Sequence, residues 1–190
     1  MGREYSGQVA QEMGVYPDSG LQGYVSRIGT EMAVLTERPK LPWTFTVMDD
    51  PQVNAFALPG GYIFVTRGIL THMNSEAELA SVLGHEIGHV TARHSVQQMT
   101  RQQLAQIGMV AGAIASDKVA QNLGLISQSL GVLFLKYSRD DESQADALGF
   151  RYALDNGYDV RKMIDMSTVL QRVSAKAGQR IPEWQSTHPD

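Results

Sequence analysis

The chain has 190 residues, of which 43% are hydrophobic and 19% are charged, a composition that suits one globular domain with a sizeable core. Its net charge of −4 and the lack of any run of Lys and Arg argue against nucleic-acid binding. Cysteine is absent, which excludes disulfides and thiolate metal sites. Any metal must therefore be bound by histidine and carboxylate side chains.

The first part of the chain predicts a helix followed by a strand. Residues 18–37 have apolar side chains at helical spacing, and Asp18 or Ser19 can cap the first turn. Pro39 lies beyond the end of this pattern. Residues 43–48 alternate large apolar side chains with threonines, which predicts a strand with one buried face.

Two further extended runs follow, at residues 54–58 and 62–66. They are separated by Pro59-Gly60-Gly61, which indicates a hairpin because glycine tolerates positive φ. With the preceding strand they predict a small sheet of about three strands. We expect this sheet to pack on the helix that comes next.

That helix is expected at about residues 75–100, capped by Ser75, and it contains the pattern H-E-x-x-H. At 3.6 residues per turn His85 and His89 lie about 40° apart, so both imidazoles can bind one ion. Glu86 lies beside them, where its carboxylate can reach a metal-bound water. Two histidines and a base are what a catalytic zinc needs, apart from a third protein ligand.

Several neighbouring residues refine this interpretation. Gly84 and Gly88 are unfavourable in a helix interior unless another element packs tightly against them. The longer zinc-protease pattern H-E-x-x-H-x-x-G-x-x-H is excluded, because Ala92 and Ser95 occupy the positions of its glycine and third histidine. His94 is one position out of register, and we expect it to be an exposed or hydrogen-bonded helix residue.

Residues 104–135 predict two further helices, the first rich in Ala, Gly and Ile. Asp117 and Lys118 interrupt the apolar pattern before it reaches the roughly 20 residues that a bilayer requires, so no integral membrane span is expected. These helices are instead candidates for contact with the rest of the domain, a partner protein or a membrane surface.

A helix at about residues 138–156 begins with an acidic first turn, as the helix dipole favours. Its residues Glu142 and Asp146 are four apart and share a face, while the small residues Ala145 and Gly149 would let another helix approach closely. The acidic run could simply be a solvated helix start. Its combination with H-E-x-x-H favours a metal site.

We therefore hypothesise that Glu142 is the third zinc ligand, after His85 and His89. Ligating histidines usually donate their outer N–H to a carboxylate or a carbonyl, which fixes the orientation of the ring. Asp146 is the candidate acceptor, and His85 is its expected partner.

The same residues carry a resemblance to a known family. Four stretches carry it: residues 83–90, Glu142 with Ala145-Asp146, the hairpin at 54–61, and Ser186-Thr187-His188-Pro189. In these stretches the chain resembles the HtpX- and BepA-like zinc metallopeptidases of the gluzincin clan. The same family includes the CAAX prenyl proteases. This resemblance implies a single metallopeptidase domain over residues 1–190, with a mainly helical α+β, zincin-like fold and one Zn²⁺ per chain.

The resemblance also implies roles for individual residues. The family's zinc ligands fall on His85, His89 and Glu142, and its general base falls on Glu86. It supports Asp146 as the partner of a ligating histidine. His188 corresponds to a histidine near the metal that helps to stabilise the transition state, and it could instead occupy the open zinc position and make the enzyme latent. The basic residue that often follows this motif is absent, which suggests a truncated C-terminal end.

The predicted function is hydrolysis of peptide bonds in protein substrates by a metal-activated water, with Glu86 as general base. The backbone of Asn54, Ala55, Phe56 and Ala57 could pair with an extended substrate, although an ordinary edge strand would look the same. The alternative function is a zinc-stabilised chaperone-like or binding module.

The resemblance favours protein quality control in the bacterial envelope or periplasm. The first five residues contain no apolar signal core. Either the targeting segment is absent from this sequence or the protein is cytoplasmic.

Overall fold

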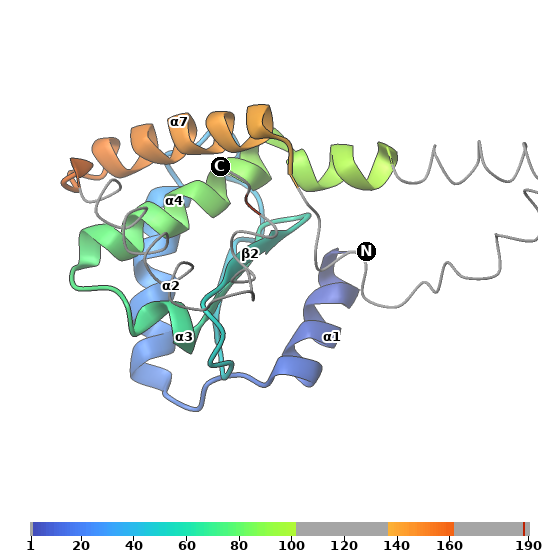
Figure 1. Cartoon of the computed structure of the whole chain (residues 1–190), viewed down its shortest axis with the longest axis vertical. Helices are drawn as coiled ribbons and strands as arrows, with labels where there is room; N and C mark the ends of the chain where they lie inside the picture. The colour runs from blue at the N-terminus through green and yellow to red at the C-terminus, as the bar shows by residue number, and fades with distance from the viewer. Residues whose placement is uncertain (1, 102–136, 162–187, 189–190) are drawn as a thin grey trace, which may run out of the picture.

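The computed structural model describes residues 2–101, 137–161 and 188 (Figure 1). The helices expected within residues 104–135 lie outside the described residues. The described part is mainly helical with a small sheet, which confirms the predicted α+β class. Within it, no helix combines the length and hydropathy that a membrane span requires.

Two helices precede the sheet. Helix α1 (Gly2–Met13) was not predicted. Helix α2 (Ser19–Ala33) begins as expected, because the Asp18 side chain accepts a hydrogen bond from the backbone N–H of Leu21. It ends before the predicted residue 37. The Thr36 hydroxyl donates to the Ala33 carbonyl at 2.7 Å and so satisfies a group that a longer helix would have used.

The sheet has the three predicted strands, β1 (Thr44–Met48), β2 (Ala55–Leu58) and β3 (Tyr62–Thr66). Their order is β1-β3-β2, with β3 parallel to β1 and antiparallel to β2. Gly60 and Gly61 have φ values of 102° and 95°, as the predicted hairpin requires. The short helix α3 (Arg67–Leu70) follows β3 directly.

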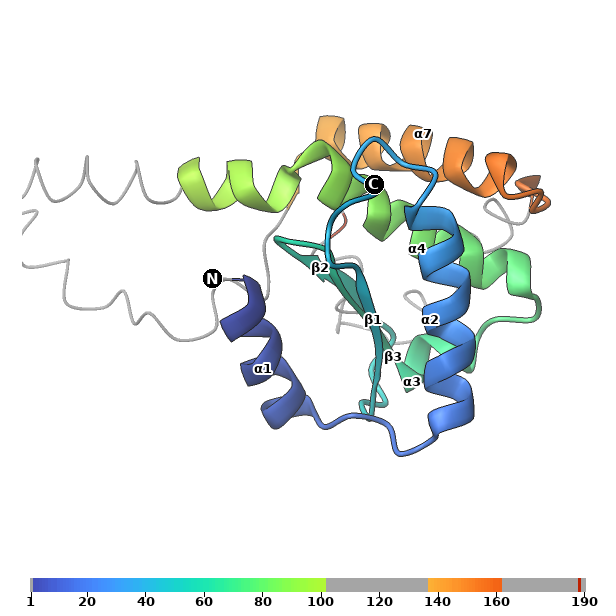
Figure 2. The same cartoon turned by 180° about the vertical axis from the view of Figure 1, so that it is seen from behind.

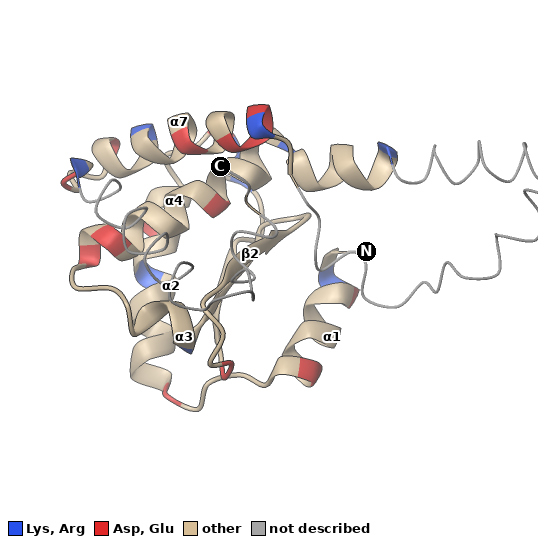
Figure 3. Ribbon diagram, viewed as in Figure 1, with Lys and Arg blue, Asp and Glu red and all other residues tan. Residues whose placement is uncertain are grey.

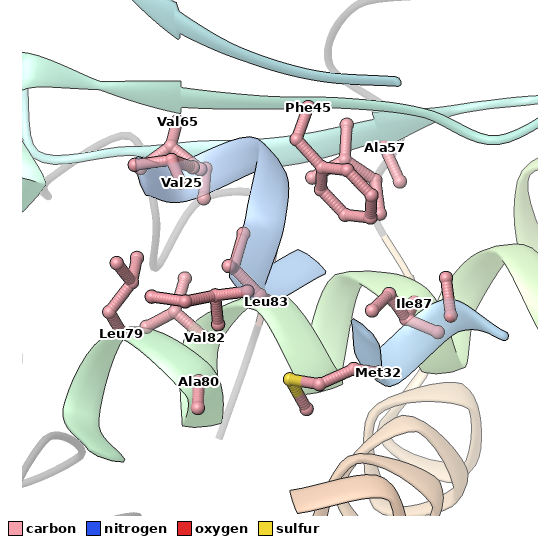
Figure 4. Close-up of a cluster of buried hydrophobic side chains, with 14 of the residues drawn as sticks. Val25, Met32, Phe45, Ala57, Val65, Leu79, Ala80, Val82, Leu83 and Ile87 are labelled. Atoms are coloured by element: carbon pink, nitrogen blue, oxygen red, sulfur yellow. The ribbon is translucent and has the colours of Figure 1, made fainter. Parts of the chain in front are cut away.

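One face of the sheet packs on α2 and on α4 (Glu76–Ala92). Figure 4 shows this core: Phe45, Ala57 and Val65 point from the sheet toward side chains of the two helices. These three residues alternate with residues that point the other way, as the pleat of a strand requires. The face carrying Phe45 and Val47 is the buried face predicted for β1.

The other face of the sheet is covered by α1, which lies opposite α2 and α4 (Figure 2). Val9 of α1 is buried against Met48, Phe56 and Phe64, and the two phenylalanine rings stack with centroids 5.1 Å apart. In β1 itself, Thr44 is exposed and Thr46 is half-buried on this side, so the single buried face predicted for this strand holds apart from Met48. Burial of both faces of the rest of the sheet was not foreseen, because α1 was not predicted from the sequence.

The predicted continuous helix over residues 75–100 is interrupted. Helix α4 starts at the expected Ser75 cap but ends at Ala92, and residues 94–101 form a separate helix. Arg93 between them has a φ of 63°, and its N–H bonds to the carbonyls of His89 and Val90. Neither Gly nor Pro marks this break, which explains why helical periodicity alone missed it.

Helix α7 (Arg139–Asp155) matches the helix predicted at residues 138–156. Ser138 and Asp141 form a reciprocal capping box at its start. Acidic side chains gather at this end of the helix, as Figure 3 shows. In Figures 1 and 2, α7 lies along α4, on the side of α4 away from the sheet.

Candidate metal centre

Helices α4 and α7 approach each other through small residues. An added Cβ on Gly84 would lie 3.0 Å from the Gly149 carbonyl oxygen, and one on Gly88 would lie 2.8 Å from the Ala145 carbonyl oxygen. A Cβ on Gly149 would lie 2.7 Å from the backbone nitrogen of His85. Both glycines of α4 are thus explained by tight packing, and the expected roles of Ala145 and Gly149 are confirmed.

This contact fixes the positions of the side chains next to it. His85 and His89 each follow one of the packed glycines on α4, while Glu142 and Asp146 lie one turn apart on α7. The Nε2 atoms of the two histidines are 2.9 Å apart. They lie 3.3 Å and 3.4 Å from the Glu142 carboxylate oxygens.

His188 joins this group from the other end of the chain. Its Nδ1 lies 3.1 Å from both carboxylate oxygens of Glu142 and 3.2 Å from Nε2 of His85. One potential ligand atom from each of His85, His89, Glu142 and His188 lies within 4.8 Å of all the others, and all four residues are buried. Tetrahedral ligands about 2.0–2.1 Å from a zinc ion are about 3.3 Å apart, so the four side chains fit such an ion.

The surroundings of Glu142 favour the ionised form of its carboxylate. Burial opposes ionisation, but hydrogen bonds with His188, His85 and His89 hold the pKa of Glu142 well below its usual range. An ionised carboxylate with two neutral imidazoles is a typical set of zinc ligands.

His85 is oriented by Asp146, whose Oδ1 lies 2.7 Å from Nδ1 of the imidazole. Burial acts to lower the pKa of His85, but the hydrogen bonds with Asp146 and Glu142 outweigh it and raise the pKa to about 10. Nδ1–H donates to Asp146 and Nε2 is directed toward Glu142, so binding of a metal ion through Nε2 would displace the proton that this nitrogen carries at neutral pH. The structure thus places Asp146 beside the histidine with which it was expected to pair.

His89 lies in a different environment. Burial lowers its pKa well below the usual value, which favours the neutral imidazole that a metal requires. The ring of Tyr137 stacks on it with centroids 4.0 Å apart. Nδ1 of His94 lies 2.9 Å from Nδ1 of His89. His94 is therefore a buried, hydrogen-bonded residue, and only the second of the two environments expected for it is observed.

Glu86 is fully buried beside the metal centre, and its carboxylate makes no hydrogen bond with any other described residue. Nε2 of His188 lies 3.6 Å from Oε1 of Glu86. Burial raises the pKa of Glu86. A carboxylate whose pKa is raised by burial binds a proton more readily than an exposed one.

The strand predicted to bind substrate, β2, is an outer strand among the described residues. The Asn54 carbonyl accepts a hydrogen bond from the Thr66 N–H, so the backbone of Asn54 faces β3. Antiparallel pairs alternate, and Phe56 therefore also faces β3, while the backbone groups of Ala55 and Ala57 face the outer edge. Of the four residues proposed to bind substrate, these two alanines present main-chain groups on the outer side.

Contacts connect this edge to the metal centre. The Ser95 hydroxyl lies 3.4 Å from the Ala57 carbonyl oxygen and 2.8 Å from the Tyr137 hydroxyl. Tyr137 in turn stacks on His89. Sequence reasoning missed both Tyr137 and Ser95, because their roles depend on the break at Arg93 and on the packing of α7.

Comparison with known proteins is consistent with this geometry. A model of peptidase family M48 matches residues 19–190. The chain belongs to peptidase family M48. This membership confirms the resemblance to HtpX- and BepA-like zinc metallopeptidases and the predicted enzyme class.

The chain is 29% identical over 199 residues to the beta-barrel assembly-enhancing protease of Yersinia pestis, covering 100% of this chain and 40% of that protein. It is 34% identical over 168 residues to the mitochondrial metalloendopeptidase OMA1 of Schizosaccharomyces pombe, covering 87% of this chain and 48% of that protein. The match to OMA1 of Arabidopsis thaliana is 30% identical and covers 95% and 36%, respectively. The chain therefore spans less than half the length of these relatives.

Proposed function

We propose that this protein is a zinc-dependent endopeptidase in which Glu86 is the general base. The observation that carries the proposal is the position of Glu86, a buried carboxylate without a hydrogen-bonding partner among the described residues, next to a cluster of four potential ligands. Leaving a carboxylate in this state is costly, and a site that transfers protons is a physical reason to retain it.

His85, His89 and Glu142 would hold the zinc ion, with Asp146 directing one of the histidines. A bound zinc ion supplies Lewis acidity, which polarises the scissile carbonyl and lowers the pKa of a coordinated water to about 7. Glu86 would take a proton from the attacking water on a carboxylate oxygen and pass it to the nitrogen of the leaving amine. Its raised pKa supports both transfers.

His188 has two candidate roles. Its Nδ1 lies 3.1–3.2 Å from atoms of Glu142 and His85, so His188 could hold the same ion together with the three proposed ligands, and this supports a latent state. If His188 moved away, water and substrate would gain access to the space beside Glu86. In that open state its ring could donate a hydrogen bond to the developing oxyanion.

The substrate would be an extended peptide that pairs with the outer edge of β2 through main-chain hydrogen bonds. The outward groups of Ala55 and Ala57 support this arrangement, because contacts through Ser95 and Tyr137 connect that edge to His89. This mode of binding would read backbone geometry and place few demands on the peptide's sequence.

A role in protein quality control of the bacterial envelope is supported by the name of the Yersinia pestis relative, a beta-barrel assembly-enhancing protease. The OMA1 relatives are named as mitochondrial metalloendopeptidases. The names of the relatives therefore agree on proteolysis but not on a cellular location.

The competing function is a zinc-stabilised binding module. Glu86 argues against it, because a structural zinc site has no use for a buried base. Elemental analysis for zinc, together with casein cleavage in the presence and absence of a chelator, separates the two functions. One zinc per chain and chelator-sensitive cleavage are expected of the enzyme. Bound zinc without any cleavage, both in the parent and in a His188→Ala variant that cannot be held latent by this residue, would favour the binding module.

A further inference from the structure

The break between α4 and the helix of residues 94–101 is unusual in its residue type. Arg93 is the one non-glycine residue with positive φ in the described part of the chain. A side chain with a Cβ is disfavoured in this left-handed conformation, and such residues persist where the surrounding structure requires them. The contacts that side chains on either side of Arg93 make are therefore a guide to why the break is retained.

The break changes the relation between two histidines. In a continuous helix His89 and His94, five residues apart, would be separated by about 140° around the axis and could not meet. With Arg93 in the left-handed conformation, their Nδ1 atoms are 2.9 Å apart. His94 is thereby buried against a candidate zinc ligand, with 2% of its surface exposed.

The second nitrogen of His94 is also engaged. Its Nε2 lies 3.0 Å from Oε1 of Gln144 and 3.7 Å from Oδ1 of Asp141, both on α7. His94 thus connects the histidine helix to the helix that carries Glu142. The two histidines of the H-E-x-x-H pattern thus have different partners: Nδ1 of His85 contacts the carboxylate of Asp146, whereas Nδ1 of His89 contacts the imidazole of His94.

We propose that His94 is a positioning residue for His89, held in place by Gln144; this inference rests on the proposed zinc function. The hydrogen-bond polarity is consistent throughout. When His89 coordinates through Nε2, its Nδ1–H donates to Nδ1 of His94, and Nε2–H of His94 donates to the amide oxygen of Gln144. This polarity needs one proton on each ring, placed on the nitrogen that donates.

Substitutions test this arrangement without relying on peptidase activity. His94→Leu keeps much of the buried volume but removes the acceptor, whereas His94→Asn offers an amide oxygen close to the position of Nδ1. His72→Leu is the matched control, because His72 precedes α4 and lies outside the metal centre. Zinc affinity is measured by competition with a chromophoric chelator, and ligand geometry by the visible absorption of the Co²⁺-loaded protein.

His94→Leu is expected to lower zinc affinity about 10–100-fold and to change the Co²⁺ spectrum. His94→Asn should recover most of the affinity, Gln144→Leu should cause a smaller loss, and His72→Leu should behave like the parent chain. Parent-like zinc affinity in His94→Leu would overturn the inference, as would equal losses in the Leu and Asn variants. If His94→Leu does not fold, parent-like affinity in Gln144→Leu overturns it.

The parent chain separates this inference from the proposed function. If the parent binds zinc and His94→Leu binds it equally well, only the positioning role is wrong. If the parent binds no zinc, the proposed function fails and this inference fails with it.

Discussion

Replacing Gly149 with alanine tests whether the close contact of α4 and α7 assembles the metal centre. The new Cβ would lie 2.7 Å from the backbone nitrogen of His85, whereas ordinary contacts begin at 3.4 Å. The added Cβ is fixed to the backbone of α7, and the nitrogen of His85 is part of the backbone of α4. An ordinary contact between them therefore requires the two helices to move apart by about 0.7 Å. Metal sites tolerate errors of only about 0.2 Å in ligand distance, and zinc affinity should therefore fall at least about tenfold.

The same change should reduce stability. Overpacking costs about 1–3 kcal/mol, and the better helix propensity of alanine returns about 0.5–1 kcal/mol. The net loss of about 0–2.5 kcal/mol corresponds to a fall in Tm of up to roughly 10 °C for a chain of this size.

Gly23→Ala is the matched control for this prediction. Gly23 is an exposed residue of α2, and its added Cβ would meet nothing within 4 Å. That variant should gain about 0.5–1 kcal/mol and leave zinc binding unchanged. Thermal unfolding of the metal-free proteins and zinc titration measure the two effects. A Gly149→Ala protein with parent-like Tm and zinc affinity would refute the proposed importance of this contact.

Three further outcomes are expected. Glu142→Ala should bind zinc much more weakly than the parent, because the charged carboxylate is lost even if His188 remains beside His85 and His89; zinc affinity equal to that of the parent would contradict the ligand assignment. His188→Ala should raise peptide turnover if this residue maintains latency, whereas slower turnover would favour the oxyanion role. Tyr152→Phe should cost about 1 kcal/mol at pH 7, because the buried hydroxyl donates to the half-exposed Glu37 carboxylate at 2.5 Å. Hydrogen bonds from Tyr152 and Arg151 lower the pKa of Glu37 in the folded protein. The stabilisation that they give is therefore present above about pH 4.3, the pKa of an unperturbed glutamate, and is lost as the pH falls through the folded-state pKa. The free energies of unfolding of the parent and Tyr152→Phe proteins, measured in urea, should therefore converge at low pH.

The parts of the fold that could be predicted have local causes. The spacing of His85 and His89 follows from helical geometry, and Gly84 and Gly88 indicated the close partner that α7 provides. The alternation in β1 and the glycines of the hairpin are likewise local signals.

The parts that could not be predicted depend on tertiary contacts. Helix α1 places a single fully buried side chain, Val9, on the sheet, which is too little for a clear apolar pattern. The left-handed conformation of Arg93 has no signal in residue type, and the burial of His94 depends on it. Tyr137 contacts His89 only because α7 packs on α4.

The central claim is that Glu86 acts as a base beside a zinc ion held by other residues, and Glu86→Gln tests it most directly. The variant keeps the size of the side chain and all three proposed ligands, but an amide cannot take up the water's proton at neutral pH. Zinc content and the rate of peptide cleavage should be measured on the same preparations of the parent and the variant. The account predicts one zinc per chain in both proteins and chelator-sensitive cleavage only in the parent. Cleavage at the parent rate by zinc-loaded Glu86→Gln would contradict it.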